Sequence, residues 1–183
     1  MITIRSYEKK DREAVENICV VTAVPVLQKG PMKKALLDVW CNYYIEREPE
    51  NVFVAANDED ETVGYILCAE SFDRWKETFL KEYIPPFKNP VGYALGKGTV
   101  PEHEKYKDLY PAHMHIDILP EYQHQGIGPR LLEAERENLR NKGVKGLMLC
   151  CGADNEKGLG FYRKAGFTEV GPEGGCIVFA LVP

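Results

Sequence analysis

The sequence predicts a mixed α/β domain, because segments with strand-like and helix-like patterns alternate along most of its 183 residues. Apolar residues recur with a period that switches between two and about 3.6 residues. In the second half each predicted strand is followed by a helix, while two early strands form a hairpin. We expect a single domain over residues 1–183, with a central twisted mixed sheet of about six to seven strands flanked by helices.

The first half supplies two helices and three strands. "MITIRSY" has the pattern of a short strand, and "DREAVENICVVTA" that of a helix, with Asp11 as its predicted N-cap. A second helix is expected from about Met32 to Glu48, because Pro49 ends it. "NVFVAAND" and "TVGYILCAE" then flank the acidic turn "DEDE", which predicts two antiparallel strands.

Residues 71–111 show a less regular pattern, and we expect an irregular insert there. One aromatic stretch, "FDRWKETFLKEYI", has helical spacing, and a loop with proline and glycine follows it. The segment is long enough to form a lid or a pocket wall. Its aromatic and acidic side chains, such as Trp75, Phe79 and Glu82, would suit an amine-bearing acceptor. The same spacing is equally typical of core residues and a solvated face.

The second half is regular again. "AHMHIDIL" is a predicted strand, residues 128–142 a helix, "GLMLCC" a strand, "EKGLGFYRKA" a short helix and "GGCIVFALVP" a closing strand. This order places a loop rich in glutamine and glycine directly before the long predicted helix of residues 128–142.

Composition excludes several functions. The formal net charge of −5 argues against a nucleic-acid partner, and no apolar run reaches the ~20 residues that span a bilayer. The first residues, "MITIRSYEKKDRE", are too charged for a signal or transit peptide. The six cysteines are scattered along the chain, a pattern that indicates reduced thiols and not a disulfide framework. We therefore expect a cytoplasmic protein without nucleic-acid or membrane partners, and a homodimer stays open.

The loop before the long helix predicts an anion site. Gly126 and Gly128 stand at the start of that helix, where backbone N–H groups lack intrahelical partners and the helix dipole is positive. Glycine lets a phosphate approach these donors closely, and Arg130 would add a cation. A plain strand-to-helix turn is the alternative. Neither a Rossmann fingerprint nor a P-loop fits, because the third glycine and the Gly-Lys-Ser/Thr ending are absent.

Two motifs together resemble the GNAT superfamily of N-acetyltransferases. "QHQGIG", residues 123–128, is similar to its Q/R-x-x-G-x-G/A acyl-CoA loop. "DNEKGLGFYRKAGF" resembles its later signature, with the matching positions Asn155, Gly158, Phe161, Tyr162, Lys164, Gly166 and Phe167. "YPAHMHIDILPEYQHQGIG" is more narrowly similar to bacterial members akin to the acetyltransferase-like domain of O-GlcNAc hydrolases.

The resemblance implies a reaction that uses acetyl-CoA as co-substrate and no metal. It places the cofactor's thioester and pantetheine arm on the strand before the loop and the pyrophosphate on the loop and first helical turn. The residues so implied are Ile116, Ile118, Gln123, Gln125, Gly126, Ile127, Gly128, Arg130, Asn155, Gly158 and Tyr162. Pro129 departs from the common pattern, because proline removes one N–H donor from the first turn.

The chemistry requires a proton donor for the leaving thiolate and a base for the attacking amine. The resemblance gives the first role to Tyr162, whose phenol is neutral at pH 7. For the base, His113, His115 and Asp117 alternate along one strand and should share a face. A histidine oriented by Asp117 is one interpretation. Hydrogen-bonded histidines that support the sheet are another, and a metal site is disfavoured because Ile118 stands where a further histidine would be needed.

These observations predict an acetyl-CoA-dependent N-acetyltransferase that moves an acetyl group to a primary amine by direct attack on the thioester. The acceptor is a small-molecule or peptide amine that the sequence does not identify. A non-catalytic acyl-CoA-binding sensor or interaction module is the alternative, which intact glycines and Tyr162 disfavour.

Overall fold

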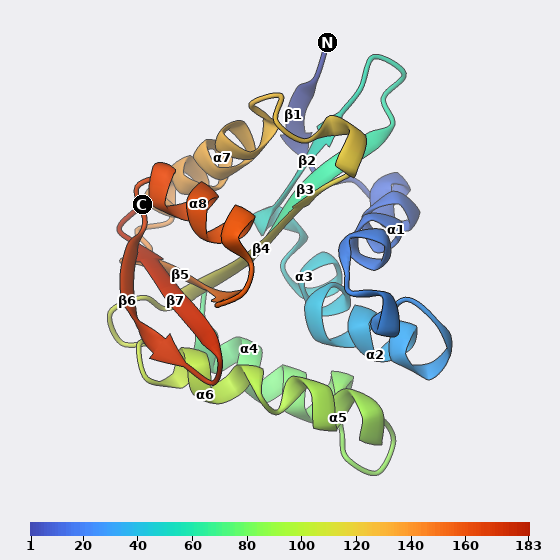
Figure 1. Ribbon diagram of the computed structural model, residues 1–183, viewed down its shortest axis with the longest axis vertical. Coiled ribbons are helices and arrows are strands. Elements are labelled where there is room, and N and C mark those ends of the chain that lie inside the picture. Colours follow the sequence, from blue (N-terminus) through green and yellow to red (C-terminus); the bar gives the residue numbers. More distant parts are fainter.

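A seven-stranded mixed sheet forms the centre of the computed structural model, which describes residues 1–183 (Figure 1). The strand order is β1-β2-β3-β4-β5-β7-β6, and only β4 and β5 run parallel. The strands are β1 (Thr3–Ser6), β2 (Val52–Ala56), β3 (Thr62–Ala69), β4 (Ala112–Ile118), β5 (Leu147–Gly152), β6 (Thr168–Glu173) and β7 (Cys176–Leu181). The predicted mixed sheet flanked by helices is therefore confirmed.

Helices cover both faces of the sheet and one end (Figure 1). α1 (Arg12–Thr22), α2 (Gly30–Trp40) and α3 (Asn42–Arg47) lie on one side, and α7 (Ile127–Asn141) and α8 (Glu156–Lys164) lie on the other. α4 (Phe72–Thr78), α5 (Pro90–Gly96) and α6 (Thr99–Glu104) form a row along the lower end in Figure 1. None of these helices is both long enough and apolar enough to cross a membrane.

Strand β3 shows how the sequence builds two cores from one sheet. Every residue of β3 is buried, so its continuous apolar run suits a strand covered on both faces. Tyr65 and Leu67 pack into the core under α1 to α3, whereas Ile66 and Cys68 pack into the core under α7 and α8. The alternation follows from the two-residue period of a strand.

The parallel pair β4 and β5 stays together over a short distance. Ala112 pairs with Leu147 and His113 pairs with Met148. Beyond these two pairs the strands have no paired residues. The edge of β4 that faces β5 therefore lacks a partner strand from Met114 to Ile118. This divergence opens the middle of the sheet, and the side chains described below surround the opening.

Three sequence predictions need correction. Residues 71–111 are not irregular: they contain α4, a π-helical turn at Phe79–Tyr83, α5 and α6. The helix expected from Met32 to Glu48 is two helices, because Cys41 leaves helical geometry at φ −130° and ψ −60°. Strand β6 was not expected at all.

Asp11 does not cap α1 through its side chain. Its carboxylate instead accepts two hydrogen bonds from Arg5 at 2.7 and 2.8 Å and others from the Glu8 backbone and the Thr62 hydroxyl, both at 2.8 Å. Asp11 therefore ties the first strand to β3. All six cysteines are free thiols, as expected from their scatter.

Candidate active site

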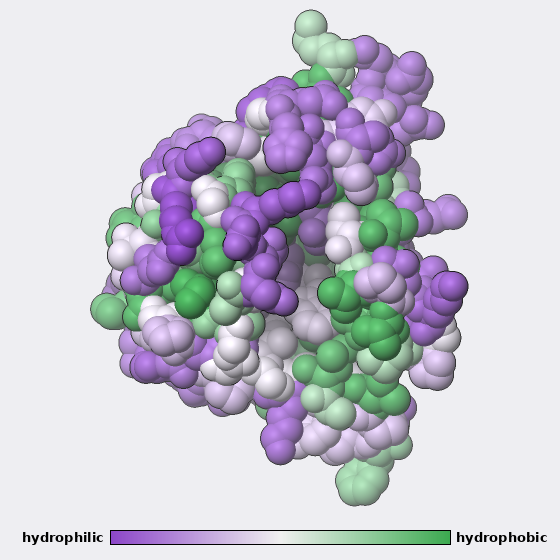
Figure 2. All heavy atoms as spheres, in the orientation of Figure 1, coloured by the Kyte–Doolittle hydropathy of each residue, from purple (hydrophilic) through white to green (hydrophobic).

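A cavity of about 600 Å³ lies at the opening between β4 and β5. Figure 2 shows the molecule hollowed between the half that carries α7 and α8 and the half that carries α1 and α2. The lining comes from the end of α1, from β4, from the loop into α7 and from α8. It comprises Val21, Thr22, Ile116, Asp117, Ile118, Pro120, Gln123, His124, Gly126, Ile127, Gly128, Pro129, Asn155, Lys157, Gly158, Phe161 and Tyr162.

The two glycines of the loop serve different purposes. Gly126 has φ +74°, a left-handed conformation that favours glycine, and a Cβ there would meet nothing within 4 Å. A Cβ on Gly128 would lie 3.0 Å from the Phe161 ring, so this glycine allows α7 and α8 to approach each other. Gly126 thus sets the turn and leaves open space beside it, and Gly128 brings the two helices together.

The start of α7 presents unpaired donors to the cavity. The N–H groups of Gly126, Ile127 and Gly128 make no hydrogen bond within the chain, as expected for the first turn of a helix. Pro129 follows and has no N–H. The helix runs for 15 residues, so its dipole places partial positive charge at these donors. An anion such as a phosphate can bind here.

Two residues predicted to bind the cofactor do not line this cavity. The Gln125 amide donates to the Glu121 carbonyl at 3.0 Å, and the Arg130 guanidinium donates to the Ile2 carbonyl at 2.9 Å. Both side chains face a different depression, beside the N-terminus. The cation that does line the cavity is Lys157, which the sequence interpretation missed although it stands within the second motif.

Helix α8 supplies the other predicted cofactor residues. The Asn155 side chain caps the helix by accepting a hydrogen bond from the Gly158 N–H at 3.0 Å, and both residues line the cavity. Tyr162 lies one turn further on, with its ring 5.6 Å from Phe167 and 5.4 Å from Phe179, measured between centroids. Phe161, another position of the second motif, also lines the cavity.

The surroundings of Tyr162 favour its protonated form. Burial, with the nearby Asp117 carboxyl and Cys151 thiol adding to the effect, raises the pKa of Tyr162 above its ordinary value. The hydroxyl makes no hydrogen bond within the chain and its residue lines the cavity. A neutral phenol with a free O–H can donate a proton to a group bound there.

Asp117 is the carboxyl group of the cavity. Burial raises the pKa of Asp117 to about 6, although the hydrogen bond from Tyr65 opposes this shift. The Tyr65 hydroxyl donates to the carboxylate at 2.6 Å and belongs to a fully buried ring on the neighbouring strand. A carboxylate with this pKa is largely ionised at pH 7 and still basic enough to accept a proton.

The two predicted histidines do not join Asp117. His113 and His115 share its face of β4, as expected, but they line a second cavity of about 310 Å³, beneath α5 and α6. The Asp117 carboxylate is held by Tyr65, so the predicted orientation of a histidine by Asp117 is wrong. Burial, with the charge of His103 adding, lowers the pKa of His115 to about 3. His115 is therefore a weak base at neutral pH.

His113 likewise does not line the cavity that contains Asp117. It is 1% exposed and lies edge-on to Trp75, Tyr44 and Phe72, with centroid distances of 4.7, 5.8 and 6.2 Å. Burial lowers the pKa of His113 well below its ordinary value, so the ring stays neutral. This environment is that of a core residue beside the second cavity.

Comparison with known proteins places this geometry in a family. Residues 24–167 match the Acetyltransferase (GNAT) family. The match covers both motifs and the strand and helix around which the cavity is built. The chain belongs to this family.

Individual relatives agree with this placement. N-alpha-acetyltransferase 30 of Schizosaccharomyces pombe is 26% identical over 127 residues, which make up 69% of this chain and 63% of that protein. The crystal structure of SsHAT superimposes on this chain with a TM-score of 0.86 at 27% sequence identity. The superposition covers 99% of this chain and 98% of the SsHAT chain.

A more distant structure shares the fold. The PaiA N-acetyltransferase of Thermoplasma acidophilum, solved in complex with coenzyme A, has a TM-score of 0.63 at 15% identity, with 100% of this chain and 99% of that one covered. None of these three proteins is described as part of an O-GlcNAc hydrolase.

Proposed function

We propose that the cavity between β4, α7 and α8 binds acetyl-CoA, and that Tyr162 and Asp117 carry the two proton transfers. The observation that carries this proposal is the arrangement of three unpaired N–H groups at the start of α7, Asp117 on β4 and Tyr162 on α8 around one cavity. The pyrophosphate binds the N–H groups of Gly126, Ile127 and Gly128. Lys157 adds a positive charge on the opposite wall.

The thioester lies along the free edge of β4, beside Ile116 and Ile118. The edge has no partner strand there. Apart from the Ile118 carbonyl, which accepts a hydrogen bond from the Gln123 amide at 3.0 Å, its backbone groups are available to the pantetheine arm and the thioester carbonyl. As the carbonyl becomes tetrahedral, an N–H donor at its oxygen stabilises the developing charge. The departing sulfur takes a proton from the Tyr162 hydroxyl, which its surroundings keep protonated.

The base is Asp117, and not His113 or His115. It lines the cofactor cavity, whereas both histidines line the other cavity. With a pKa of about 6, Asp117 is ionised at neutral pH and can accept the proton that the attacking amine releases. The hydrogen bond from the Tyr65 hydroxyl fixes its orientation.

The acceptor is the α-amino group of a peptide. The name of the fission yeast relative motivates this choice, although the matched segment spans less than two thirds of that protein. A base of pKa about 6 suits an α-amine, whose pKa near 7.7–8.0 leaves roughly a tenth of it unprotonated at pH 7. A lysine side chain, with a pKa near 10.4, is almost entirely protonated at that pH.

The rim of the cavity also fits a peptide. Val24 and Val26, which are 58% and 70% exposed, follow the end of α1 next to Val21 of the lining. In Figure 2 apolar side chains gather over this α1 to α2 segment beside the hollow. An apolar side chain close to a peptide N-terminus can pack there.

The test is acetylation of matched peptides followed by mass spectrometry. Each peptide carries one internal lysine and either a free or a blocked N-terminus, and acetyl-CoA is the donor. We expect acetylation of the free α-amine and little product from the blocked peptides. Product on lysine in both sets would overturn the acceptor assignment. Binding of acetyl-CoA without turnover of any amine would instead support the sensor alternative.

The narrower resemblance to the acetyltransferase-like domain of O-GlcNAc hydrolases stays a prediction from the loop sequence. Location in the cytoplasm and a homodimer stay predictions as well. None of these three predictions changes the proposed chemistry.

A further inference from the structure

The second cavity contains a cluster of side chains with metal-binding atoms that the acetyl transfer does not use. It lies between α6 and the strands β4, β5 and β7, about 310 Å³ in volume. Its lining includes Glu102, His103, His113, His115, Cys150 and Cys176. No residue of this set lines the cofactor cavity.

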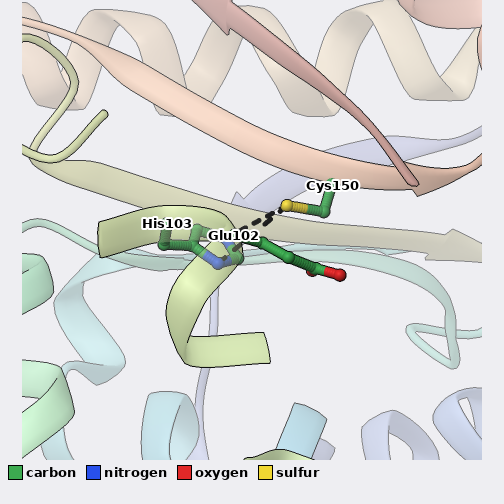
Figure 3. A group of neighbouring side chains, drawn as sticks. All are labelled: Glu102, His103 and Cys150. Carbon is green, nitrogen blue, oxygen red and sulfur yellow. Dashed lines mark hydrogen bonds between the residues drawn. The ribbon is translucent and has the colours of Figure 1, made fainter. Parts of the chain in front are cut away.

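Three of these residues offer a carboxylate oxygen, an imidazole nitrogen and a sulfur at one point. Glu102 and His103 come from α6, and Cys150 comes from β5 and points toward that helix (Figure 3). One donor atom of each lies within 4.8 Å of the others. We propose that Glu102, His103 and Cys150 bind a zinc ion, with the Cys176 thiolate as the fourth ligand.

The choice of metal follows from the donor atoms. Zinc binds sulfur, imidazole nitrogen and carboxylate oxygen in tetrahedral sites, whereas magnesium and calcium select oxygen. Bonds of about 2.0–2.3 Å to a tetrahedral ion hold the ligand atoms roughly 3.5 Å apart. The Cys150 sulfur lies 4.0 Å from each His103 ring nitrogen, so small side-chain rotations bring the set onto an ion.

The hydrogen bond that His103 makes leaves one ring nitrogen free for zinc. Its Nδ1 lies 2.8 Å from the Thr99 carbonyl oxygen, and only a protonated Nδ1 can donate to that acceptor. In the neutral ring the lone pair then resides on Nε2. A hydrogen bond from one ring nitrogen to a carbonyl commonly fixes the tautomer and direction of a metal-binding histidine.

Cys176 reaches the same cavity from the neighbouring strand. In the antiparallel pair of β5 and β7 it lies opposite Gly152, which makes it the diagonal neighbour of Cys150. Diagonal neighbours on one face of a sheet are within reach of each other's side chains. Cys151, which follows Cys150 on β5, points to the opposite face of the sheet and belongs to the core there.

An independent observation indicates that the cavity takes up a group from outside the chain. His113 is 1% exposed and both of its ring nitrogens lack a hydrogen-bond partner, as does the buried indole nitrogen of Trp75. Both residues line this cavity, and the His113 and His103 rings lie 4.9 Å apart between centroids. Buried polar atoms are normally partnered. A water held in the cavity beside the four-coordinate ion would supply hydrogen-bond partners to these atoms.

The ion would join α6 of the 71–111 segment to β5 and β7. Cross-linking these parts stabilises the wall of the second cavity, because a metal bound only by the folded chain adds its binding free energy to folding. Acetyl-CoA binding depends on other residues. The zinc site is thus separable by experiment from the proposed acetyl transfer.

The test is titration of the reduced full-length protein with Co(II), which absorbs in the near ultraviolet when a thiolate binds it. We expect about one Co(II) per chain with this charge-transfer band, and displacement of the band by Zn(II). The band should be lost in Cys150→Ser and in His103→Gln. It should persist in Cys151→Ser, the matched control on the same strand.

A folded, reduced parent protein without the band would overturn the proposal, and so would an unchanged band in Cys150→Ser. A second measurement needs no variant. Hydrogen exchange of Thr99–Glu104 should slow when Zn(II) is added to the parent protein, and should not change with Mg(II). Equal exchange with and without Zn(II) would contradict the site.

Discussion

The two cavities along β4 are built in different ways. The cofactor cavity depends on backbone: a left-handed glycine, unpaired N–H groups at a helix start and the free edge of a strand. The second cavity depends on side chains that α6, β4, β5 and β7 bring together. The two halves of β4 serve different cavities, since residues 116–118 line the first and residues 113–115 line the second. One strand can thus support two unrelated sites.

This difference determines which substitutions each site tolerates. A backbone site is lost when a bulky side chain enters or the turn changes, and it is insensitive to which apolar residues surround it. A side-chain site is lost when a single donor atom is removed. The predictions that follow use this contrast, starting with the largest expected effect.

Asp117→Asn should lower kcat by roughly 10²–10⁴-fold, the usual contribution of a positioned base. The pKa of Asp117 is about 6, and the ionised form accepts the proton. In the parent protein kcat/KM should therefore rise as the pH increases through about 6 and be lost below it. This acidic limb of the pH profile should vanish in Asp117→Asn. The measurement is a pH profile of kcat/KM.

His115→Gln is the matched variant, on the same face of the same strand. It faces the second cavity and should keep both the rate and the limb near pH 6. A profile that loses this limb in His115→Gln and keeps it in Asp117→Asn would assign the base to the histidine.

Tyr162→Phe should lower kcat by about 10²-fold with little change in acetyl-CoA binding, because only the proton donor is removed. The ring keeps its packing against Phe167 and Phe179, so the melting temperature should change little. Tyr106→Phe, whose hydroxyl contacts the Val170 carbonyl at 3.3 Å, serves as control. Full turnover by Tyr162→Phe at every pH would remove the acid role.

Pro129→Ala should strengthen acetyl-CoA binding. The change restores an N–H in the first turn of α7, and one such hydrogen bond contributes about 0.5–1.5 kcal/mol, which is roughly a two- to tenfold change in Kd. Calorimetric titration measures it. Weaker binding by Pro129→Ala would mean that the proline's rigidity matters more than the missing donor.

The last prediction concerns stability and a carboxyl outside both cavities. Glu135 on α7 is fully buried, and burial raises the pKa of Glu135 to about 8. The unfolded value is about 4.3, so between these pH values the folded state binds more protons and the free energy of unfolding falls as pH rises. Glu135→Gln should flatten this decline, by on the order of 1 kcal/mol per pH unit. Parallel denaturation curves at pH 5 and 8 provide the check.

Local features made the cofactor loop predictable. The left-handed turn at Gly126 and the free N–H groups of a helix start are properties of a few consecutive residues, and so is the Asn155 cap. Arg130 does not line the cavity because its guanidinium donates to the carbonyl of Ile2, which is distant in sequence. Lys157 and Thr22 enter the cavity through helix orientation, which no short pattern encodes.

Other features depend on register between distant strands. Asp117 meets Tyr65 only because β3 and β4 pair with these residues opposite each other. Glu102 and Cys150 meet only after α6 packs on β5. Strand β6 escaped prediction because it contains Gly171 and Pro172, which weaken a strand pattern, and Pro172 is tolerated there since β6 is an edge strand.

The central claim is that the open space beside Gly126 receives the phosphates of acetyl-CoA. Calorimetric titration of acetyl-CoA into the parent, Gly126→Trp and Gly143→Trp tests it most directly. Both glycines have positive φ, +74° and +69°, with nothing near the Cβ position, so the two substitutions strain the backbone alike at opposite ends of α7. We expect binding by the parent and by Gly143→Trp, and none by a folded Gly126→Trp. Equal binding by both variants, or no binding by the folded parent, would contradict the claim.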